Sequence, residues 1–192
     1  MTTFVEKEIL DSAEIIKNSL SLSAGIQSAA NEIINSLKNG NKVIIFGNGG
    51  SAADSQHIAA ELVGRYLCER KSLPAIALST DTSILTALGN DYSFDQIFSR
   101  QCEGLVCKND VVIGISTSGN SKNVINGLKL SKEKKAKTIG LLGNGGGIIS
   151  KFVDIPIIVE SSSTPRIQEV HRVVYHIICD LVEQSLTKTK IK

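Results

Sequence analysis

The sequence predicts an α/β protein in which five parallel strands form one sheet with helices on both faces. Five short apolar runs, rich in Val, Ile and Leu, lie at 42–46, 74–78, 111–115, 138–142 and 155–159. Segments with apolar residues at helical spacing separate most of these runs. Continuous apolar runs that alternate with helices are typical of buried parallel strands joined by right-handed crossovers.

The helices follow in order along the chain. Residues 4–20 and 24–38 carry apolar side chains at helical spacing, and Gly40 ends the second of these helices. Further helices are predicted at 52–67, 82–88, 94–106 and 122–134, and a last helix at 166–187 precedes a tail, 187–192, that we expect to fray. One domain, 1–192, would thus comprise N-terminal helices (1–40), a βα core (41–165) and a C-terminal helix (166–187).

Length and composition fit a soluble globular domain. The 192 residues are 42% hydrophobic and 21% charged, and the net charge of +2 is too small to indicate a nucleic acid or a membrane surface as partner. We expect no signal peptide at the start of the chain, and no apolar run reaches the roughly 20 residues that span a bilayer. We therefore expect a cytoplasmic protein. Its four cysteines lack Cys-x-x-Cys spacing and are expected to be buried free thiols.

The most informative segment, Gly47-Asn48-Gly49-Gly50-Ser51, follows the first strand and precedes a helix. Free backbone N–H groups and the helix dipole favour an anion at such a junction. The segment lacks the glycine spacing of a dinucleotide-binding loop, because residue 52 is alanine, and it lacks the Gly-Lys-Ser/Thr of a Walker loop. These features predict an anion site for a phosphorylated small molecule.

A second loop, Ser116-Thr117-Ser118-Gly119-Asn120-Ser121, follows the third strand and carries four hydroxyls. Hydroxyl and backbone N–H groups are the donors that a phosphate monoester needs. A helix N-cap and turn is the alternative, but one hydroxyl would suffice for it, so we favour phosphate binding. Ligands of open parallel sheets bind beyond the carboxyl ends of the strands, which makes both loops candidates for one pocket.

His57 and Glu61 are four residues apart and so share one face of the helix after the glycine loop. With Gln168 and His176 of the last helix they would make four ligands for a divalent transition metal such as zinc, although His57 alone could also be a packed or surface histidine. Gln168 and His176 are eight residues apart, or roughly 12 Å along a helix. Either Gln168 precedes the helix proper, or two copies of the chain share the site; we therefore expect a pocket at a subunit interface.

Asn90 and Asp91 follow a predicted helix and Gly89, and they predict a third polar loop. Two interpretations are equally good: an ordinary turn, or a site that hydrogen-bonds sugar hydroxyls.

On these residues the chain resembles the bacterial phosphoheptose isomerases of the sugar-isomerase (SIS) superfamily. The similar motifs are Gly47–Ser51, His57-x-x-x-Glu61, Gly89–Asp91, Gly114–Ser121 and Arg166–His171 followed by His176. The resemblance implies a three-layer, flavodoxin-like sandwich that assembles as a homotetramer with interfacial active sites. One departure lies at Pro165, where some members have Asp or Ala, and it concerns only the entry into the last helix.

The resemblance also implies roles for individual residues. The phosphate would be held by Ser51, Ser116, Ser118 and Ser121. The sugar would be lined by Asn48, Gly49, Gly50, Asn90, Asp91 and Thr117. One zinc ion per subunit would be bound by His57, Glu61, Gln168 and His176, with Glu61 and Gln168 also contacting substrate. Glu61 and His176 would be catalytic.

The implied reaction converts sedoheptulose 7-phosphate to D-glycero-D-manno-heptose 7-phosphate, an aldose–ketose isomerisation that leads to the heptose of lipopolysaccharide. One carboxylate and one imidazole suffice to move a proton through an enediol. Zinc would polarise the carbonyl, yet a zinc-bound Glu61 is a poorer base, so either Glu61 leaves the metal or the metal is mainly structural. The alternatives are a non-catalytic SIS protein of the replication-initiator-associating type, another phosphosugar isomerase, or a sugar-phosphate-sensing domain.

Overall fold

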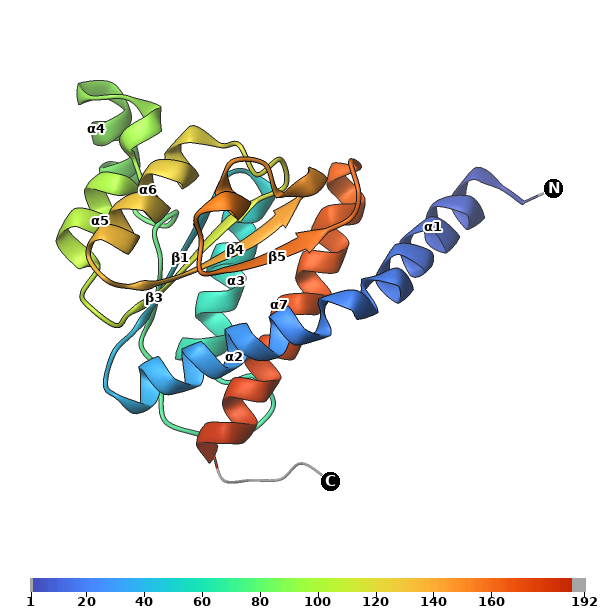
Figure 1. The fold of residues 1–192 in the computed structure, drawn as a ribbon, viewed down its shortest axis with the longest axis horizontal. Helices are drawn as coiled ribbons and strands as arrows, with labels where there is room; N and C mark the ends of the chain where they lie inside the picture. Colours follow the sequence, from blue (N-terminus) through green and yellow to red (C-terminus); the bar gives the residue numbers. More distant parts are fainter. Residues whose placement is uncertain (1, 188–192) are drawn as a thin grey trace.

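The computed structural model describes residues 2–187 and shows one parallel sheet between two layers of helices (Figure 1). The strands are β1 (Val43–Gly47), β2 (Ala75–Ala77), β3 (Val111–Ser116), β4 (Lys137–Gly143) and β5 (Ile155–Val159), in the order β2-β1-β3-β4-β5. Every neighbouring pair is parallel. This order is the flavodoxin-like one, and the predicted α/β sandwich is confirmed.

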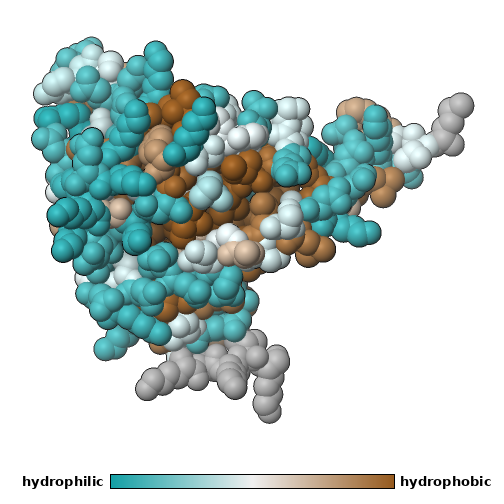
Figure 2. Space-filling view, viewed as in Figure 1, coloured by the Kyte–Doolittle hydropathy of each residue, from teal (hydrophilic) through white to brown (hydrophobic). Residues whose placement is uncertain are grey.

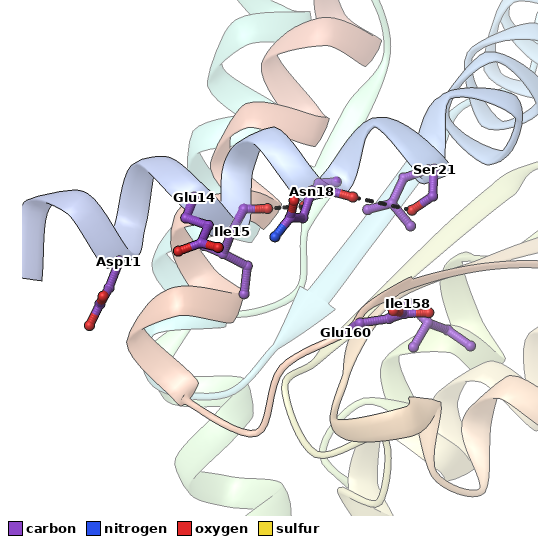
Figure 3. Close-up of a pocket in the computed structure, with 9 residues that line it drawn as sticks. Asp11, Glu14, Ile15, Asn18, Ser21, Ile158 and Glu160 are labelled. Atoms are coloured by element: carbon purple, nitrogen blue, oxygen red, sulfur yellow. Dashed lines mark hydrogen bonds between the residues drawn. The ribbon is translucent and has the colours of Figure 1, made fainter.

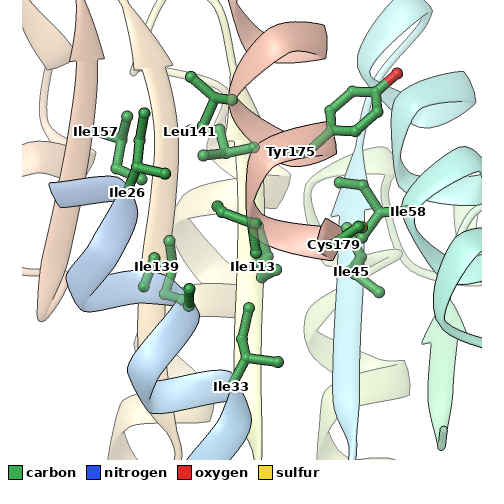
Figure 4. Packing of buried hydrophobic residues seen from close by; sticks show 14 of the residues in the cluster. Ile26, Ile33, Ile45, Ile58, Ile113, Ile139, Leu141, Ile157, Tyr175 and Cys179 are labelled. Atoms are coloured by element: carbon green, nitrogen blue, oxygen red, sulfur yellow. The ribbon is translucent and has the colours of Figure 1, made fainter. Parts of the chain in front are cut away.

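Helices α2 (Ser23–Lys38), α3 (Gly50–Val63) and α7 (Thr164–Thr187) cover one face of the sheet, whereas α5 (Ser99–Leu105) and α6 (Lys122–Glu133) cover the other (Figure 1). Alternate strand residues feed two separate cores: Ile45 and Ile113 pack under the first set of helices, and Phe46 under the second. Figure 4 shows the first core, where isoleucines of the strands meet α2, α3 and α7. The apolar runs of β1, β3 and β4 are continuous because both faces of these central strands are buried, whereas the edge strands β2 and β5 each keep an exposed position.

The N-terminal arm consists of α1 (Phe4–Asn18) and the short 3-10 helix η1 (Ser19–Leu22). Thr3 and Glu6 form a reciprocal capping box that begins α1. The helix projects from the body of the molecule (Figure 1), and none of its residues is buried. The two predicted N-terminal helices are therefore present, with the break between them at residues 19–22.

Several local predictions were wrong. The predicted helix at 94–106 is split into the 3-10 helix η2 (Phe94–Gln96) and α5, and α3 ends at Val63 instead of residue 67. The predicted loop at Asn90 and Asp91 is the last turn of α4 (Thr82–Asp91), because the helical ladder continues through the bond from the Tyr92 backbone N–H to the Leu88 carbonyl. Glycine at position 89 is tolerated in the helix and does not end it.

The cysteines also differ from expectation. Cys102 and Cys179 are buried, but Cys68 is half-buried and Cys107 is exposed. Burial raises the pKa of Cys102 to about 11 and that of Cys179 to about 12, so both remain neutral thiols. Within residues 2–187, no helix is long and apolar enough to cross a membrane. The predicted fraying beyond Thr187 lies outside the described residues.

Candidate functional site

The glycine loop and the serine loop lie side by side, because β1 and β3 are neighbours in the sheet. The chain leaves β1 for β2 on one side and returns to β3 on the other, so the loops stand at the switch point where α/β proteins bind ligands. Asn48 and Asn123 exchange two amide hydrogen bonds of 2.9 Å across the gap. The predicted shared position of the two loops is thus present in the structure.

Backbone packing explains the glycines of the first loop. A side chain at Gly47 would lie 2.7 Å from the Ser51 Cβ and 2.9 Å from the Ile115 carbonyl oxygen. Gly49 caps α3 with a φ of 56°, a conformation that favours glycine. Ser51 is buried in the first turn of α3, while Gly49 and Gly50 are exposed. The loop therefore presents backbone at the positive end of α3.

In the serine loop, the hydroxyls converge. The Ser116 Oγ lies 3.1 Å from the Ser121 Oγ and 3.4 Å from the Ser118 Oγ. Ser121 occupies the N-cap position of α6, yet its side chain makes no capping bond. Ser118 accepts a bond from the Asn120 backbone N–H and so supports the turn, and Thr117 is half-buried beside it. The geometry is that of a cluster of hydroxyls at a helix start, as an anion site requires.

The glycine-rich segment after β4, which includes the 3-10 helix η3 (Asn144–Gly146), supports the serine loop from behind. Gly119 has a φ of 66°, and a Cβ there would collide with the Gly146 carbonyl. The Gly119 carbonyl accepts a bond of 3.1 Å from the Ile149 N–H, and the Asn120 Oδ1 accepts one of 3.0 Å from the Ile148 N–H. This third glycine segment therefore lets one backbone pass closely against another.

His57, Glu61 and His176 meet where α3 packs against α7. One ligand atom from each lies within 4.8 Å of the others, and the His57 Nε2 is 2.9 Å from the Glu61 Oε1. The two imidazole rings are 5.1 Å apart. Partial burial lowers the pKa of His176, and the neighbouring His57 lowers it further, which favours the neutral imidazole that binds metals. Two imidazoles and one carboxylate at this spacing fit a zinc ion.

A partly buried hydrogen-bond chain that the sequence interpretation missed supports His57. The Tyr175 hydroxyl lies 3.1 Å from the His57 Nδ1 and 3.3 Å from the Asp54 Oδ1. Arg172 donates from Nε to the Tyr175 oxygen at 3.1 Å and approaches Asp54 at 3.4 Å. Burial and the Asp54 charge raise the pKa of Tyr175 to about 12, so it stays a neutral phenol. Asp54, His57 and Glu61 share a helix face, which was the available signal.

The other predicted site residues lie elsewhere in the chain. Gln168 is within α7, so the idea that it precedes the helix was wrong, and its amide lies against Gly50 at the start of α3. It is roughly 12 Å along α7 from His176. Asn90 and Asp91 are exposed at the end of α4, where the Asn90 amide donates to the Asp91 carboxylate at 2.9 Å.

A hollow of about 450 Å³ lies under the N-terminal arm (Figure 3), and none of the predicted site residues lines it. Asp11 and Glu14 of α1 and Glu160 beyond β5 line it. Three carboxylates would repel a phosphate, so this hollow is a poor candidate for the predicted sugar-phosphate site.

Comparison with known proteins identifies relatives over most of the chain. The family described as SIS domain matches residues 8–143. The phosphoheptose isomerase of Citrifermentans bemidjiense is 59% identical over 165 residues, which is 86% of each chain. That of Aliarcobacter butzleri is 50% identical over 188 residues, 97% of this chain and 100% of the relative.

Solved structures agree with these sequence relatives. Phosphoheptose isomerase GmhA from Neisseria gonorrhoeae is 41% identical with a TM-score of 0.90, over 94% of this chain and 97% of that one. The phosphoheptose isomerase from Francisella tularensis is 34% identical with a TM-score of 0.91, over 94% and 96%. The sequence identity, the matching fold and the motifs agree, and the chain belongs to the SIS-domain family of phosphoheptose isomerases.

Proposed function

We propose that this chain is an aldose–ketose isomerase that converts sedoheptulose 7-phosphate to D-glycero-D-manno-heptose 7-phosphate, for the heptose of lipopolysaccharide. The observation that carries the proposal is the meeting of Glu61 with His176, which are 115 positions apart in the sequence. A carboxylate and a neutral imidazole beside each other are the acid–base pair that this isomerisation requires. The identity of 50–59% to proteins named phosphoheptose isomerase supports the same reaction.

The two ends of the substrate would meet different parts of the site. Ser51, Ser116, Ser118 and Ser121 would bind the phosphate through hydroxyl and backbone N–H donors. Asn48, Gly49, Gly50, Thr117, Asn90 and Asp91 would line the sugar. At the reactive end, one of Glu61 and His176 removes a proton from C1, and the pair returns a proton to C2 through an enediol. Holding both groups on packed helices orients them before substrate arrives.

Zinc, one ion per subunit, would be held by His57, Glu61 and His176, with Gln168 as the fourth ligand and a substrate contact. When bound, it supplies Lewis-acid polarisation of the substrate carbonyl. Glu61 would then serve as a base only in conformers that release the metal; otherwise the ion would stabilise the α3–α7 contact.

We further propose that the active site is shared between subunits of a homotetramer. Glu61 lies eleven residues after Gly50, or roughly 16 Å along α3, which is farther than an extended heptulose phosphate reaches. A partner copy that brings its own loops or its own Glu61 to the site would close this gap. Gln168 raises the same problem of reach from His176.

The N-terminal arm offers the surface for such assembly. The exposed fractions of its large apolar side chains are 77% for Phe4, 64% for Val5, 63% for Ile9, 61% for Leu10 and 75% for Leu20. Figure 2 shows hydrophobic side chains on the arm and along the hollow beside it. Several large exposed apolar side chains on one projecting helix support a protein interface there. Ile9→Glu should dissociate the tetramer, as measured by light scattering, and abolish isomerase activity. Lys7→Glu, on the same helix, should change neither the mass nor the activity.

The partners would be the sugar phosphate and other copies of the chain, and the protein would act in the cytoplasm. The net charge of +2 is too small to favour binding to a nucleic acid or a membrane surface. We also propose that residues 1–192 form one SIS domain, with N-terminal helices (1–40), a βα core (41–165) and a C-terminal helix (166–187).

The function is tested by incubating the protein with sedoheptulose 7-phosphate and following the product by NMR. Glu61→Gln and His176→Gln should each lower turnover by about 10²–10⁴-fold while phosphate-ester binding is retained. Glu133→Gln, on the exposed side of α6, is the matched control and should keep full activity. Wild-type turnover in either site variant would refute the acid–base roles. A non-catalytic SIS protein would bind the ester without forming product.

A further inference from the structure

We propose that Asp54 and Tyr175 are positioning residues that fix the tautomer of His57, so that its Nε2 lone pair points to the place where Glu61 and His176 would bind zinc. This inference rests on the metal site of the proposed function. It assigns a role to two buried polar side chains, with exposed fractions of 2% and 1%.

The donors and acceptors around the Tyr175 hydroxyl lead to this assignment. The phenol has one proton to donate and two lone pairs to accept with, and three polar groups surround it: Asp54, His57 and Arg172. The Arg172 guanidinium can only donate, so it occupies one lone pair. The Asp54 carboxylate can only accept, so in its contact with Asp54 the phenol must be the donor. The remaining lone pair of Tyr175 then accepts from the His57 Nδ1–H.

The other side of the His57 ring follows from this arrangement. With the proton on Nδ1, the Nε2 carries a lone pair and faces the Glu61 Oε1 at 2.9 Å. Two acceptors at that distance repel each other unless a metal cation or a second ring proton lies between them, and a bound zinc ion would remove this repulsion. The His176 imidazole, within 4.8 Å of both, supplies the third donor. In the competing tautomer, Nε2–H would donate to Glu61 and close the metal position.

The fold brings the members of this hydrogen-bond chain together on two packed helices. Asp54, His57 and Glu61 lie three and four residues apart on one face of α3, and Tyr175 and His176 are consecutive on α7. Figure 4 shows the Tyr175 ring leaving α7 above the isoleucines of the core, with its hydroxyl at the end nearest α3. The Tyr175 hydroxyl thereby links α7 to His57, the proposed zinc ligand on α3. Outer hydrogen bonds of this kind typically change metal affinity by about 10–100-fold.

The test compares zinc affinity in Tyr175→Phe, Asp54→Asn and the wild type, measured on metal-free protein by competition with a chromogenic chelator. Both variants should bind zinc about 10–100-fold more weakly. Tyr66→Phe is the matched control, because the centroid of the Tyr66 ring lies 5.9 Å from that of the His176 ring. The Tyr66 hydroxyl takes no part in the hydrogen bonds around the Tyr175 hydroxyl. Wild-type zinc affinity in Tyr175→Phe would overturn the proposal.

A second readout separates positioning from packing. In ¹⁵N-histidine NMR spectra, His57 of the metal-free wild type should show the Nδ1–H tautomer, and Tyr175→Phe should shift it toward Nε2–H. A wild-type Nε2–H tautomer would refute the inference even if Asp54→Asn failed to fold. Product formation by the wild type is assayed separately. An active enzyme with unaltered zinc affinity in Tyr175→Phe would reject this inference alone, whereas an inactive wild type would reject the proposed function.

Discussion

Glu183→Gln should destabilise the protein more than any surface change, because Glu183 holds the chain that leaves α3. Its carboxylate, 1% exposed, accepts from the backbone N–H groups of Tyr66, Leu67 and Cys68 at 2.9, 2.6 and 2.7 Å. Arg70, whose side chain is 6% exposed, donates from Nε at 2.9 Å. Burial alone would raise the pKa of Glu183, but these donors together lower it. The charged carboxylate is thus matched to four donors.

The magnitude follows from what glutamine cannot do. It keeps one acceptor oxygen and replaces the other with an NH₂ group that faces backbone donors, while Arg70 stays buried without its counter-charge. Removing one partner of a buried ion pair costs about 3–5 kcal/mol. Total stabilities of domains are about 5–15 kcal/mol. At about 2–4 °C per kcal/mol for a chain of this size, Tm should fall by about 6–20 °C.

The assay is urea unfolding followed by far-UV circular dichroism, with wild type and variant at the same protein concentration. Glu133→Gln, an exposed substitution of the same chemistry on α6, should remain within about 0.5 kcal/mol of the wild type. An unfolding free energy for Glu183→Gln within about 1 kcal/mol of the wild-type value would show that these buried bonds do not hold the segment, and the reasoning would be wrong.

Three further predictions concern the loops, pH and metal. Gly119→Ala should raise the KM for the sugar phosphate by at least about 10-fold, because its Cβ would collide with the Gly146 carbonyl. Gly145→Ala is the control, since Gly145 has a similar φ of 71° and a Cβ there would meet nothing within 4 Å. Equal KM values in the two variants would contradict the steric argument. The folded-state pKa of Glu183 is lowered, so the charged carboxylate stabilises the folded protein fully above its unfolded pKa of about 4.3. This stabilisation is lost as the pH falls through the folded-state pKa. The unfolding free energy should therefore fall less steeply with decreasing pH in Glu183→Gln than in the wild type. Chelation should remove about one zinc per subunit together with activity, and added zinc should restore both; full activity in protein shown by metal analysis to be zinc-free would leave the ion without a catalytic role.

Local sequence patterns sufficed for most of the architecture. The central strands β1, β3 and β4 are continuous apolar runs because they are buried on both faces, and that pattern is visible in any window of a few residues. His57 and Glu61 could be placed on one face because helical spacing fixes residues four apart. The glycines around Gly47 predicted a loop between a strand and a helix, and the structure places them between β1 and α3; that a side chain at Gly47 would collide with Ser51 and Ile115 is visible only in the structure.

Predictions failed where hydrogen bonding or contacts between distant segments decide the outcome. Asn90 and Asp91 have the composition of a turn, yet the bond from the Tyr92 N–H to the Leu88 carbonyl keeps them helical. Cys107 resembled the other thiols in sequence, and only its place in the fold left it exposed. Composition does not specify which backbone carbonyl an N–H group will reach.

The sequence by itself determined the strands, most of the helices and the chemical character of the loops, because these depend on neighbours within one or two turns. Only the tertiary structure decided that α7 packs against α3 so that Tyr175 reaches His57, and that His176 joins Glu61. These contacts join residues more than a hundred positions apart. They form because both helices bury their apolar faces on the same side of one sheet, and no short stretch of sequence records that shared surface.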